Sequence, residues 1–326
     1  MNFETIRLEK ELYGITGKSF TKALTEIDPD ENYKGTPYES LDAYERQLKR
    51  FDIKVAGAEC DKVEKFFLST ESAVLFPEYI RRQIKQGIEE SSILDDTAAA
   101  ISYIDTVDYR SLVMTASGSN NVSEGGALPT TTVTLASTAT RLSKFARKLS
   151  CTYESIRKQR IEAFGVVLRA LGADIAGSIN ALVAANLSSG ITASTIAGNT
   201  LAYSDLATFW ASMTDANMDV MLCSPAVMAK ILALDEMKLV VSDYMKTGRA
   251  VTPYGVTLIK CQALASSGNI VGIDSSKAAE AVFGSDVMID TDRLLSTQNR
   301  EISCSVLVGV SRVFDGAVKV LATVKN

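Results

Sequence analysis

The sequence predicts an α+β protein in which stretches of different composition follow one another along the chain. Three observations support this: a highly charged leader of about 70 residues, a nearly uncharged β-forming stretch at 111–140, and a long apolar helix at 153–187. Short helices and strands then alternate, which is typical of an α/β lobe. With 326 residues, 46% of them hydrophobic, the chain can bury a sizeable core.

Histidine is absent, and this excludes several classes of enzyme. No Ser-His-Asp or Cys-His nucleophile and no histidine-bearing zinc site can form. The five cysteines lie at least 38 residues apart without a CxxC pair, so we expect them to be small buried hydrophobes. Glycine-rich phosphate loops are also missing. We therefore expect no catalytic residue, no cofactor and no metal.

Charge and hydropathy point to a soluble, cytoplasmic product. The net charge is −5, which does not favour a chain that binds nucleic acid by bulk electrostatics. The most apolar helical stretch, residues 161–187, is interrupted by Arg169, Asp174 and Asn180. We therefore expect no membrane span.

The leader differs sharply in charge from the rest of the chain. Residues 1–70 hold 25 charged side chains, against 48 in the other 256 positions, which predicts a boundary near residue 70. Thr36-Pro37-Tyr38-Glu39 suits a capping box, followed by one amphipathic stripe: Leu41, Tyr44, Leu48 and Phe51. Asp28 to Glu39 resembles a calcium loop, but Tyr33 replaces the required glycine, so we predict a polar turn. The leader is either an arm that docks on a partner chain or a helical cap on its own domain.

Residues 111–140 contain a single charged side chain, Glu124. Residues 103–113 alternate as a strand does, residues 131–135 are mostly β-branched, and the loose segment 117–126 lies between them. We predict a long two-stranded β-arm over about 100–150 with a flexible tip. Because a bare hairpin of this kind is marginal and prone to aggregate, the pattern favours an intersubunit arm over one folded on its own domain. The contact candidates are Glu124, Leu128, Val133 and Leu135.

The strongest helical pattern covers residues 153–187, about 50 Å if unbroken. Its apolar residues recur at steps of three and four: Ile161, Phe164, Leu168, Leu171, Ile175, Ile179 and Leu182. Glycines 165, 172 and 177 make continuity less certain and permit close packing. Seven bases, opposed only by Glu154, lie before and within its start: Arg141, Lys144, Arg147, Lys148, Arg157, Lys158 and Arg160. They are candidates for ion pairing or for contact with packaged DNA, although an ordinary solvated surface is slightly favoured.

Residues 195–285 predict a compact α/β lobe. Strands are expected at 219–223, 255–260 and 269–273, and helices from Ser204-Asp205 and over 225–234. Trp210 is expected in the core. At the end of the chain, alternation from Ile302 to Val310 and the turn Asp315-Gly316 predict a β-hairpin that returns over 317–323.

The order of these elements, with a short helix from Pro77, resembles the major capsid protein of tailed double-stranded-DNA bacteriophages, the Hong Kong 97-type fold. Four segments carry the resemblance: Phe76-Pro-Glu-Tyr-Ile-Arg-Arg82, Glu124-Gly-Gly-Ala-Leu-Pro129, Lys148-Leu-Ser-Cys-Thr-Tyr-Glu-Ser-Ile156 and Val308-Gly-Val-Ser-Arg-Val-Phe-Asp-Gly316. The match covers roughly residues 73–326, and its specificity lies in the order and spacing of the motifs.

The resemblance implies a division of the chain into six parts. These are a charged N-terminal arm (1–72), the start of the peripheral domain (73–99), an extended β-loop (100–150), the spine helix of the peripheral domain (151–194), an axial domain (195–285) and a peripheral-domain β-hairpin (286–326). The extended loop would overlie an adjacent subunit.

The implied function is structural and not enzymatic. Copies would form pentamers and hexamers that close into an icosahedral shell around the double-stranded-DNA genome. The shell would assemble in the host cytoplasm and become the virion capsid. Portal, scaffold and cement proteins are implied as partners, as is non-specific contact with packaged DNA, whereas a membrane is not. Two alternatives are an encapsulin-type compartment that encloses a cargo enzyme and an enzyme built on residues 195–285.

Some members of the family join their subunits by a Lys–Asn isopeptide bond whose lysine lies in the extended loop. Here no lysine occurs between Lys85 and Lys144. We therefore expect a shell held together without covalent links.

Overall fold

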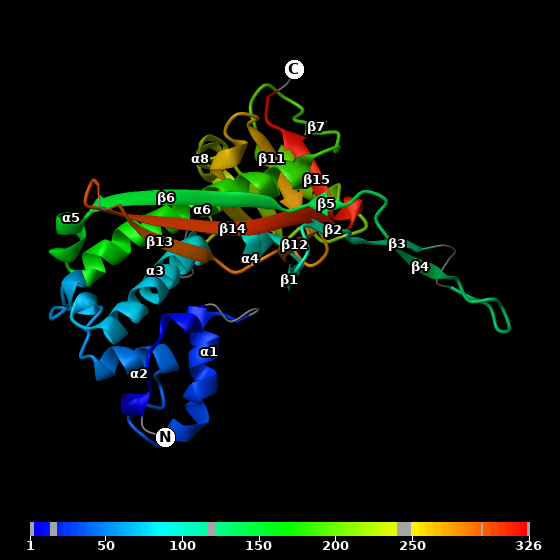
Figure 1. Cartoon of the computed structure of the whole chain (residues 1–326). Helices are drawn as coiled ribbons and strands as arrows, with labels where there is room; N and C mark the ends of the chain where they lie inside the picture. The colour runs from blue at the N-terminus through cyan, green and yellow to red at the C-terminus, as the bar shows by residue number, and fades with distance from the viewer. Residues whose placement is uncertain (1–2, 14–17, 117–120, 240–248, 295, 325–326) are drawn as a thin grey trace. The chain divides into compact units, whose positions relative to one another are not determined.

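The computed structural model describes residues 3–13, 18–116, 121–239, 249–294 and 296–324 (Figure 1). The chain forms two compact units, each built from three segments. Unit 1 comprises Met1–Ser91, Ala146–Ile175 and Val287–Ser305, and unit 2 comprises Ser92–Phe145, Ala176–Asp286 and Val306–Asn326.

Unit 1 is mostly helical. Its helices are η1 (Phe3–Thr5), η2 (Lys10–Tyr13), α1 (Phe20–Ile27), η3 (Asp30–Tyr33), α2 (Ala43–Arg50), η4 (Val63–Phe67), α3 (Thr70–Ser91), α5 (Tyr153–Arg157) and the first half of α6 (Ile161–Ser188). Its strands are most of β6 (Ser143–Thr152), β13 (Met288–Leu294) and the first half of β14 (Asn299–Arg312).

The leader folds onto α3 of its own chain. Helix α2 buries Tyr44 and Leu48, as the amphipathic stripe predicts. The helix start predicted at Thr36-Pro37 is wrong, because the capping box forms between Asp42 and Glu45, with hydrogen bonds of 2.8 and 3.0 Å. Glu39 instead accepts the Gly35 N–H at 2.9 Å, which leaves it in a turn.

A buried ion pair joins the turn after α1 to α2. Arg46 Nε donates to Asp28 at 2.7 Å, and both side chains are fully buried. The same guanidinium reaches Asp30 at 2.9 Å and stacks on the Tyr33 ring at 4.1 Å. Asp28 and Asp30 of the supposed calcium loop therefore bind an arginine, which confirms the polar turn.

Helix α3 begins at Thr70 and contains Pro77, so the prediction of a short helix from Pro77 is wrong. Next to the proline, a leader side chain bridges the Glu78 N–H and the Val74 carbonyl of α3. The Tyr13 hydroxyl accepts the Glu78 N–H at 3.0 Å and donates to the Val74 carbonyl at 2.7 Å. The leader thus adds hydrogen bonds to two backbone groups of α3 beside Pro77, which has no N–H of its own to donate. Burial raises the pKa of Tyr13, so its hydroxyl stays protonated.

Helices α3 and α6 lie side by side in unit 1, and glycines permit their close approach (Figure 1). A Cβ on Gly172 would meet the Ile84 carbonyl oxygen and lie 3.0 Å from the Ile88 nitrogen. A Cβ on Gly87 would meet the backbone of Arg169. Of the glycines that weakened the helix prediction, Gly172 therefore serves packing against the backbone of α3.

The long helix is not continuous, which corrects the prediction over 153–187. It is interrupted between α5 and α6, where residues 159–161 pair with the leader. The Gln159 carbonyl accepts the Val63 N–H at 2.9 Å, and the Ile161 N–H donates to the Asp61 carbonyl at 2.9 Å. This long-range pairing takes backbone groups that an unbroken helix would use internally.

Among the described helices, α6 has the length and apolar composition of a membrane-crossing segment. Its predicted stripe is buried by protein at Ile161, Phe164, Leu168, Ile175 and Ile179. We therefore interpret α6 as a core helix.

Unit 2 holds a six-stranded sheet in the order β7-β15-β11-β8-β10-β9. Its strands are β7 (Ser194–Thr195), β8 (Val220–Cys223), β9 (Ala250–Val251), β10 (Thr257–Lys260), β11 (Asn269–Ile273) and β15 (Val318–Ala322). Its helices are α4 (Leu94–Thr97), α7 (Tyr203–Ala211), α8 (Pro225–Leu232), α9 (Asp235–Lys238), η5 (Gln262–Leu264), η6 (Asp315–Ala317) and the second half of α6. The three predicted strands of the lobe are confirmed, with small shifts at their ends.

Two predictions about side chains in the lobe have opposite outcomes. Ser224 caps α8 by accepting the Val227 N–H, as its Ser-Pro start suggests. Trp210 is not in the core: it is 36% exposed and packs against Tyr254, while the neighbouring Phe209 takes the core position. Adjacent aromatic residues on a helix point in different directions, so only one of the two could face the sheet.

The predicted C-terminal hairpin does not form. Strand β14 buries Ile302, Cys304, Val306, Val308 and Val310, which confirms its alternation. However, β14 pairs with β12 (Ala279–Phe283) and β13, whereas β15 pairs with β11 and β7. Segment 313–317 carries the chain from one sheet to the other, because its backbone bonds go to Ala278 and Asp274.

Four of the five cysteines are buried thiols, as expected, and Cys151 is half-buried.

We predict that an alanine at Gly172 destabilises the unassembled subunit by about 1–3 kcal/mol, because the new methyl group overlaps the backbone of α3. The matched control is Gly177→Ala, in the same helix, where a Cβ meets nothing within 4 Å. This control should stabilise the subunit by about 0.5–1 kcal/mol. Urea unfolding measures both changes, and equal effects of the two substitutions would contradict the packing argument.

We predict that Tyr13→Phe costs about 1–3 kcal/mol of the same free energy of unfolding, because two backbone groups next to Pro77 lose their bridge. Tyr38→Phe is the control, since the Tyr38 ring packs on Phe3 and its hydroxyl makes no hydrogen bond among the described residues. A loss of similar size in both variants would show that the hydroxyl bridge is not the cause.

Candidate assembly surfaces

The β-arm is an antiparallel hairpin over residues 108–141. Strand β2 (Asp108–Tyr109) pairs with β5 (Thr140–Arg141), and β3 (Leu112–Ala116) pairs with β4 (Thr131–Leu135). The predicted limits of 100–150 are too wide, because β1 (Ala100–Tyr103) pairs with β12 and β6 pairs with β14. The strands on each side of the arm, β1 and β6, therefore belong to the five-stranded sheet that also contains β12, β13 and β14. Residues 117–120 of the expected tip lie outside the described residues.

The register of β3 and β4 separates an apolar face from a threonine-rich one. Leu112 lies opposite Leu135, and Val113 lies opposite Thr134. Opposed residues share a face and neighbours alternate, so Leu112, Val133 and Leu135 lie on one face. Their exposed fractions are 54%, 57% and 61%.

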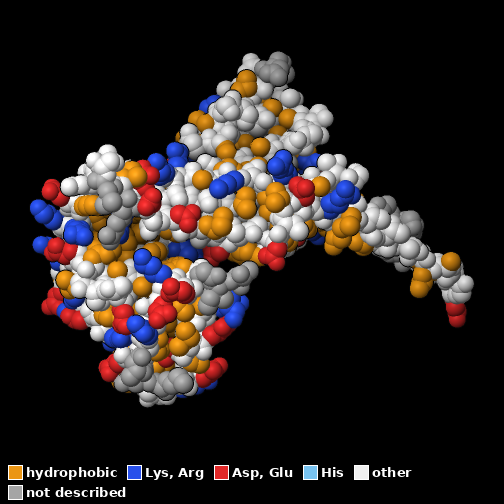
Figure 2. Space-filling view, in the orientation of Figure 1, with side chains coloured by type: hydrophobic (Ala, Val, Ile, Leu, Met, Phe, Trp, Pro, Cys, Tyr) orange, Lys and Arg blue, Asp and Glu red, His pale blue; other side chains and the backbone are white. Residues whose placement is uncertain are grey.

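Side chains with charge are rare along the arm (Figure 2). Large hydrophobic residues at the surface are instead concentrated from its base to β4: Ile101, Tyr103, Val107, Leu112, Val113, Leu128, Val133 and Leu135. An exposed apolar surface of this kind is typical of a site of protein association, and the contact residues stay a prediction.

A tight turn presents Glu124, the one charged residue in 111–140. The Gly126 N–H donates to the Ser123 carbonyl at 2.9 Å, and Gly125 has a φ of +75°, which favours glycine. Glu124 therefore lies at the corner of the turn and is exposed. Leu128 follows at 81% exposure.

Two hydrogen bonds from the region of the arm's base converge on Glu280. Tyr109 donates to one carboxylate oxygen, and Ser102 donates to the other at 2.9 Å. Burial, together with the hydrogen bond and the charge of Glu280, raises the pKa of the Tyr109 phenol. These contacts tie the base of the arm to β12.

The seven basic candidates are all exposed, and they are divided between the two units. Arg141 and Lys144 belong to unit 2, and the other five belong to unit 1. Within unit 1, Lys148 pairs with Glu301 at 2.8 Å and Arg147 pairs with Asp174. Several of these bases thus have partners in their own chain, and their contact with DNA stays a prediction.

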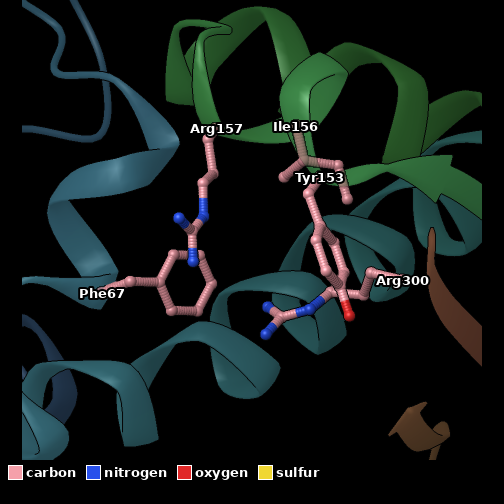
Figure 3. Close-up of a pocket in the computed structure, with 5 residues that line it drawn as sticks. All are labelled: Phe67, Tyr153, Ile156, Arg157 and Arg300. Carbon is pink, nitrogen blue, oxygen red and sulfur yellow. The ribbon is translucent and has the colours of Figure 1, made fainter. Parts of the chain in front are cut away.

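Arg157 lines a small pocket in unit 1 (Figure 3). The other lining residues are Phe67, Tyr153, Ile156 and Arg300. Arg157 and Arg300 both approach the Phe67 ring, at 6.0 and 4.5 Å from its centroid. The Tyr153 hydroxyl is buried and makes no hydrogen bond within the described chain. Sequence reasoning missed Phe67, Tyr153 and Arg300, because they come from three distant segments that share no motif.

No group of three Cys, Asp or Glu side chains suited to a metal ion occurs in the described ranges.

A family model of phage capsid proteins matches residues 133–320, which is more than half of the chain. The chain belongs to this family. The match includes the second part of β4, α6 and the six-stranded sheet except for the end of β15. Among curated proteins, none matches the sequence.

Solved structures with the same fold include three shell proteins. A virus-like particle from Pyrococcus furiosus has 14% identity and a TM-score of 0.52, covering 75% of this chain and 98% of its own. The capsid of a native GTA particle has 12% identity and a TM-score of 0.51, covering 74% and 91%. Gordonia phage Cozz has 11% identity and a TM-score of 0.50, covering 72% and 87%.

The capsid protein therefore has the Hong Kong 97-type fold, which confirms the resemblance found in the sequence. It is a structural protein of the shell. The limits of its axial and peripheral domains and its contact residues stay predictions.

We predict that Leu135→Asp lowers the yield of assembled particles at least about tenfold while changing the subunit's free energy of unfolding by less than about 0.5 kcal/mol. The side chain is exposed in the subunit and would be covered only in the shell. Thr134→Asp adds the same charge on the opposite face and should assemble normally. Sedimentation separates particles from subunits, and equal defects in the two variants would contradict the assignment of the contact face.

Proposed function

We propose that this chain is the major capsid protein of a tailed bacteriophage. Its copies form pentamers and hexamers that close into an icosahedral shell around the double-stranded-DNA genome. Assembly takes place in the cytoplasm of the bacterial host, and the product is the virion capsid. The protein has no enzymatic activity, binds no cofactor and needs no membrane.

The family match over residues 133–320 is the observation that carries this proposal. The arm supports it independently, because its apolar face is exposed in the subunit and the two-stranded ribbon cannot cover itself. An arm on one subunit that lies on a different surface of the next makes a heterologous contact, and such contacts close into rings. Permanent interfaces of this kind bury on the order of 2,000–5,000 Å².

Portal, scaffold and cement proteins are proposed partners of the assembled shell. Contact with DNA is non-specific and runs through exposed basic side chains, for which Arg141, Lys144 and Lys158 are candidates. With a net charge of −5, the chain would contribute local basic surfaces, not a generally basic interior.

Electron microscopy of negatively stained, purified protein tests the proposal. Closed particles with packaged DNA and a tail in infected cells would support it. A species of 35.1 kDa in light scattering, under all conditions that assemble related shells, would contradict it.

An encapsulin-type shell is the second candidate, because a virus-like particle shares the fold over 75% of this chain. Its particles would enclose a protein and not a genome. Nuclease-protected DNA in purified particles would exclude it, whereas a copurifying enzyme in DNA-free particles would favour it.

We predict that assembled shells dissociate into single chains when boiled in detergent, because the arm offers no lysine for an isopeptide bond. Gel electrophoresis should show one band near 35.1 kDa. Ladders of linked subunits that persist under reducing conditions would show a covalent link.

A further inference from the structure

The β-arm is attached to its own chain by two short connections. Residues 105–107 lead into β2, because Ile104 still donates its N–H to the Phe283 carbonyl at 2.9 Å and so continues the pairing of β1. On the other side, Leu142 leads from β5 into β6 (Figure 1). The Leu142 N–H donates to the Val107 carbonyl at 2.9 Å, so the two connections are paired with each other. The contacts that hold them determine how freely the arm moves as a whole.

Leu142 is held in a notch that two glycines leave open. Its side chain is 5% exposed and lies over Gly284 and Gly309. A Cβ on Gly284 would lie 2.7 Å from Leu142 Cδ1, and a Cβ on Gly309 would lie 2.5 Å from Cδ2. Both separations are shorter than a van der Waals contact, so only glycine leaves room for this side chain. The connection into β6 is therefore fixed by close packing.

Glu280 holds the other connection through hydrogen bonds. Tyr109 donates to one carboxylate oxygen, and Ser102 donates to the other at 2.9 Å. These two hydroxyls come from the two sides of residues 105–107. All three side chains are partly exposed, in contrast to Leu142. Hydrogen bonds between partly exposed groups exchange with water, so their net contribution is small and they can open.

The two attachments lie on the same face of the sheet. Glu280, Val282 and Gly284 alternate along β12 and its end, so they point to one side. Gly309 of β14 lies opposite Val282 and shares that side. The arm is thus held from one face at an apolar point that is packed and at a polar point that can open.

We propose that Tyr109, Ser102 and Glu280 form a clasp that holds the arm in one orientation before any other copy binds. Leu142 is the pivot about which the arm turns when the clasp opens. The clasp restricts the orientations of the arm in the free subunit, so less ordering is required on assembly. The part of the inference that concerns assembly rests on the proposed function. The clasp itself belongs to the single chain, because none of its hydrogen bonds needs a second copy.

Distances between two spin labels in the unassembled full chain test the clasp. One label is attached at Thr134→Cys on the arm, and the other at Lys260→Cys at the exposed end of β10. Both are introduced with Cys151→Ser, since the other four thiols are buried. Double electron–electron resonance then gives the distance distribution. Tyr109→Phe should broaden this distribution at least about twofold, because the arm gains orientations when the phenol no longer binds Glu280.

Tyr103→Phe is the matched control. It removes a hydroxyl that makes no hydrogen bond among the described residues and keeps a ring that stacks on Phe283, with 5.5 Å between the centroids. The width of the distribution should not change. Equal widths in Tyr109→Phe and Tyr103→Phe, whether both narrow or both broad, would overturn the proposal.

Two substitutions at Glu280 distinguish the clasp from a general loss of structure. Glu280→Ala removes both acceptor oxygens and should broaden the distribution as Tyr109→Phe does. Glu280→Gln keeps one acceptor oxygen for Tyr109 and should stay close to the unsubstituted chain. The measurement is made under native conditions, where lower global stability alone leaves the folded distances unchanged. A narrow distribution in Glu280→Ala, or one in Glu280→Gln as broad as in Glu280→Ala, would contradict the clasp.

Unlabelled chains test the consequence for assembly. In Tyr109→Phe, the subunit concentration needed for assembly should rise about threefold or more, because each arm must be ordered as it binds. Tyr103→Phe should assemble as the unsubstituted chain does. A broadened distribution with unchanged assembly would show that the proposed role in assembly is wrong. Failure of the unsubstituted protein to form any particle would instead overturn the proposed function, and the distances in the free subunit would still test the clasp.

Discussion

The apolar face of the β-arm is the constraint on which the function of this capsid protein depends. The pairing of Leu112 with Leu135 fixes which side chains share that face, and no third strand from the described residues covers them. Burial of this surface must therefore come from another molecule. An arm that a neighbouring copy covers is stabilised by assembly, because binding stabilises the state that it selects.

Elements fixed by local chemistry could be predicted from the sequence. Alternation located β14, Ser224-Pro225 located the start of α8, and the scarcity of charge located the arm. Predictions failed where hydrogen bonds to residues distant in the sequence determine where an element ends or what it pairs with. The Val63 N–H donates to the Gln159 carbonyl where the long helix is interrupted. Between β14 and β15, the backbone of Val313 and Ala317 bonds to Ala278 and Asp274 and not to a hairpin partner. No local pattern encodes these partners.

The two candidate surfaces differ in the same way. The arm residues Glu124, Leu128, Val133 and Leu135 follow one another in sequence, so composition alone identified them. The two pockets that share Phe67 and Arg300 join residues from the leader, α3, α5, β13 and β14. Their cationic and apolar parts therefore meet only after folding. Arg157 entered the sequence argument as one base among seven, and only its neighbours distinguish it.

The fold of the leader also shapes the wider pocket beside Phe67, because leader residues line it. The Tyr13 hydroxyl bridges two backbone groups of α3 next to Pro77. Pro77 in turn lines the wider pocket together with Lys10 and Phe67 of the leader. Arg46 and Asp28 in turn hold the two leader helices together through a buried ion pair that would be costly to break. Unfolding of the leader would therefore disturb the residues that line this pocket. The fold of the charged leader and the surface of unit 1 around Phe67 are thus coupled.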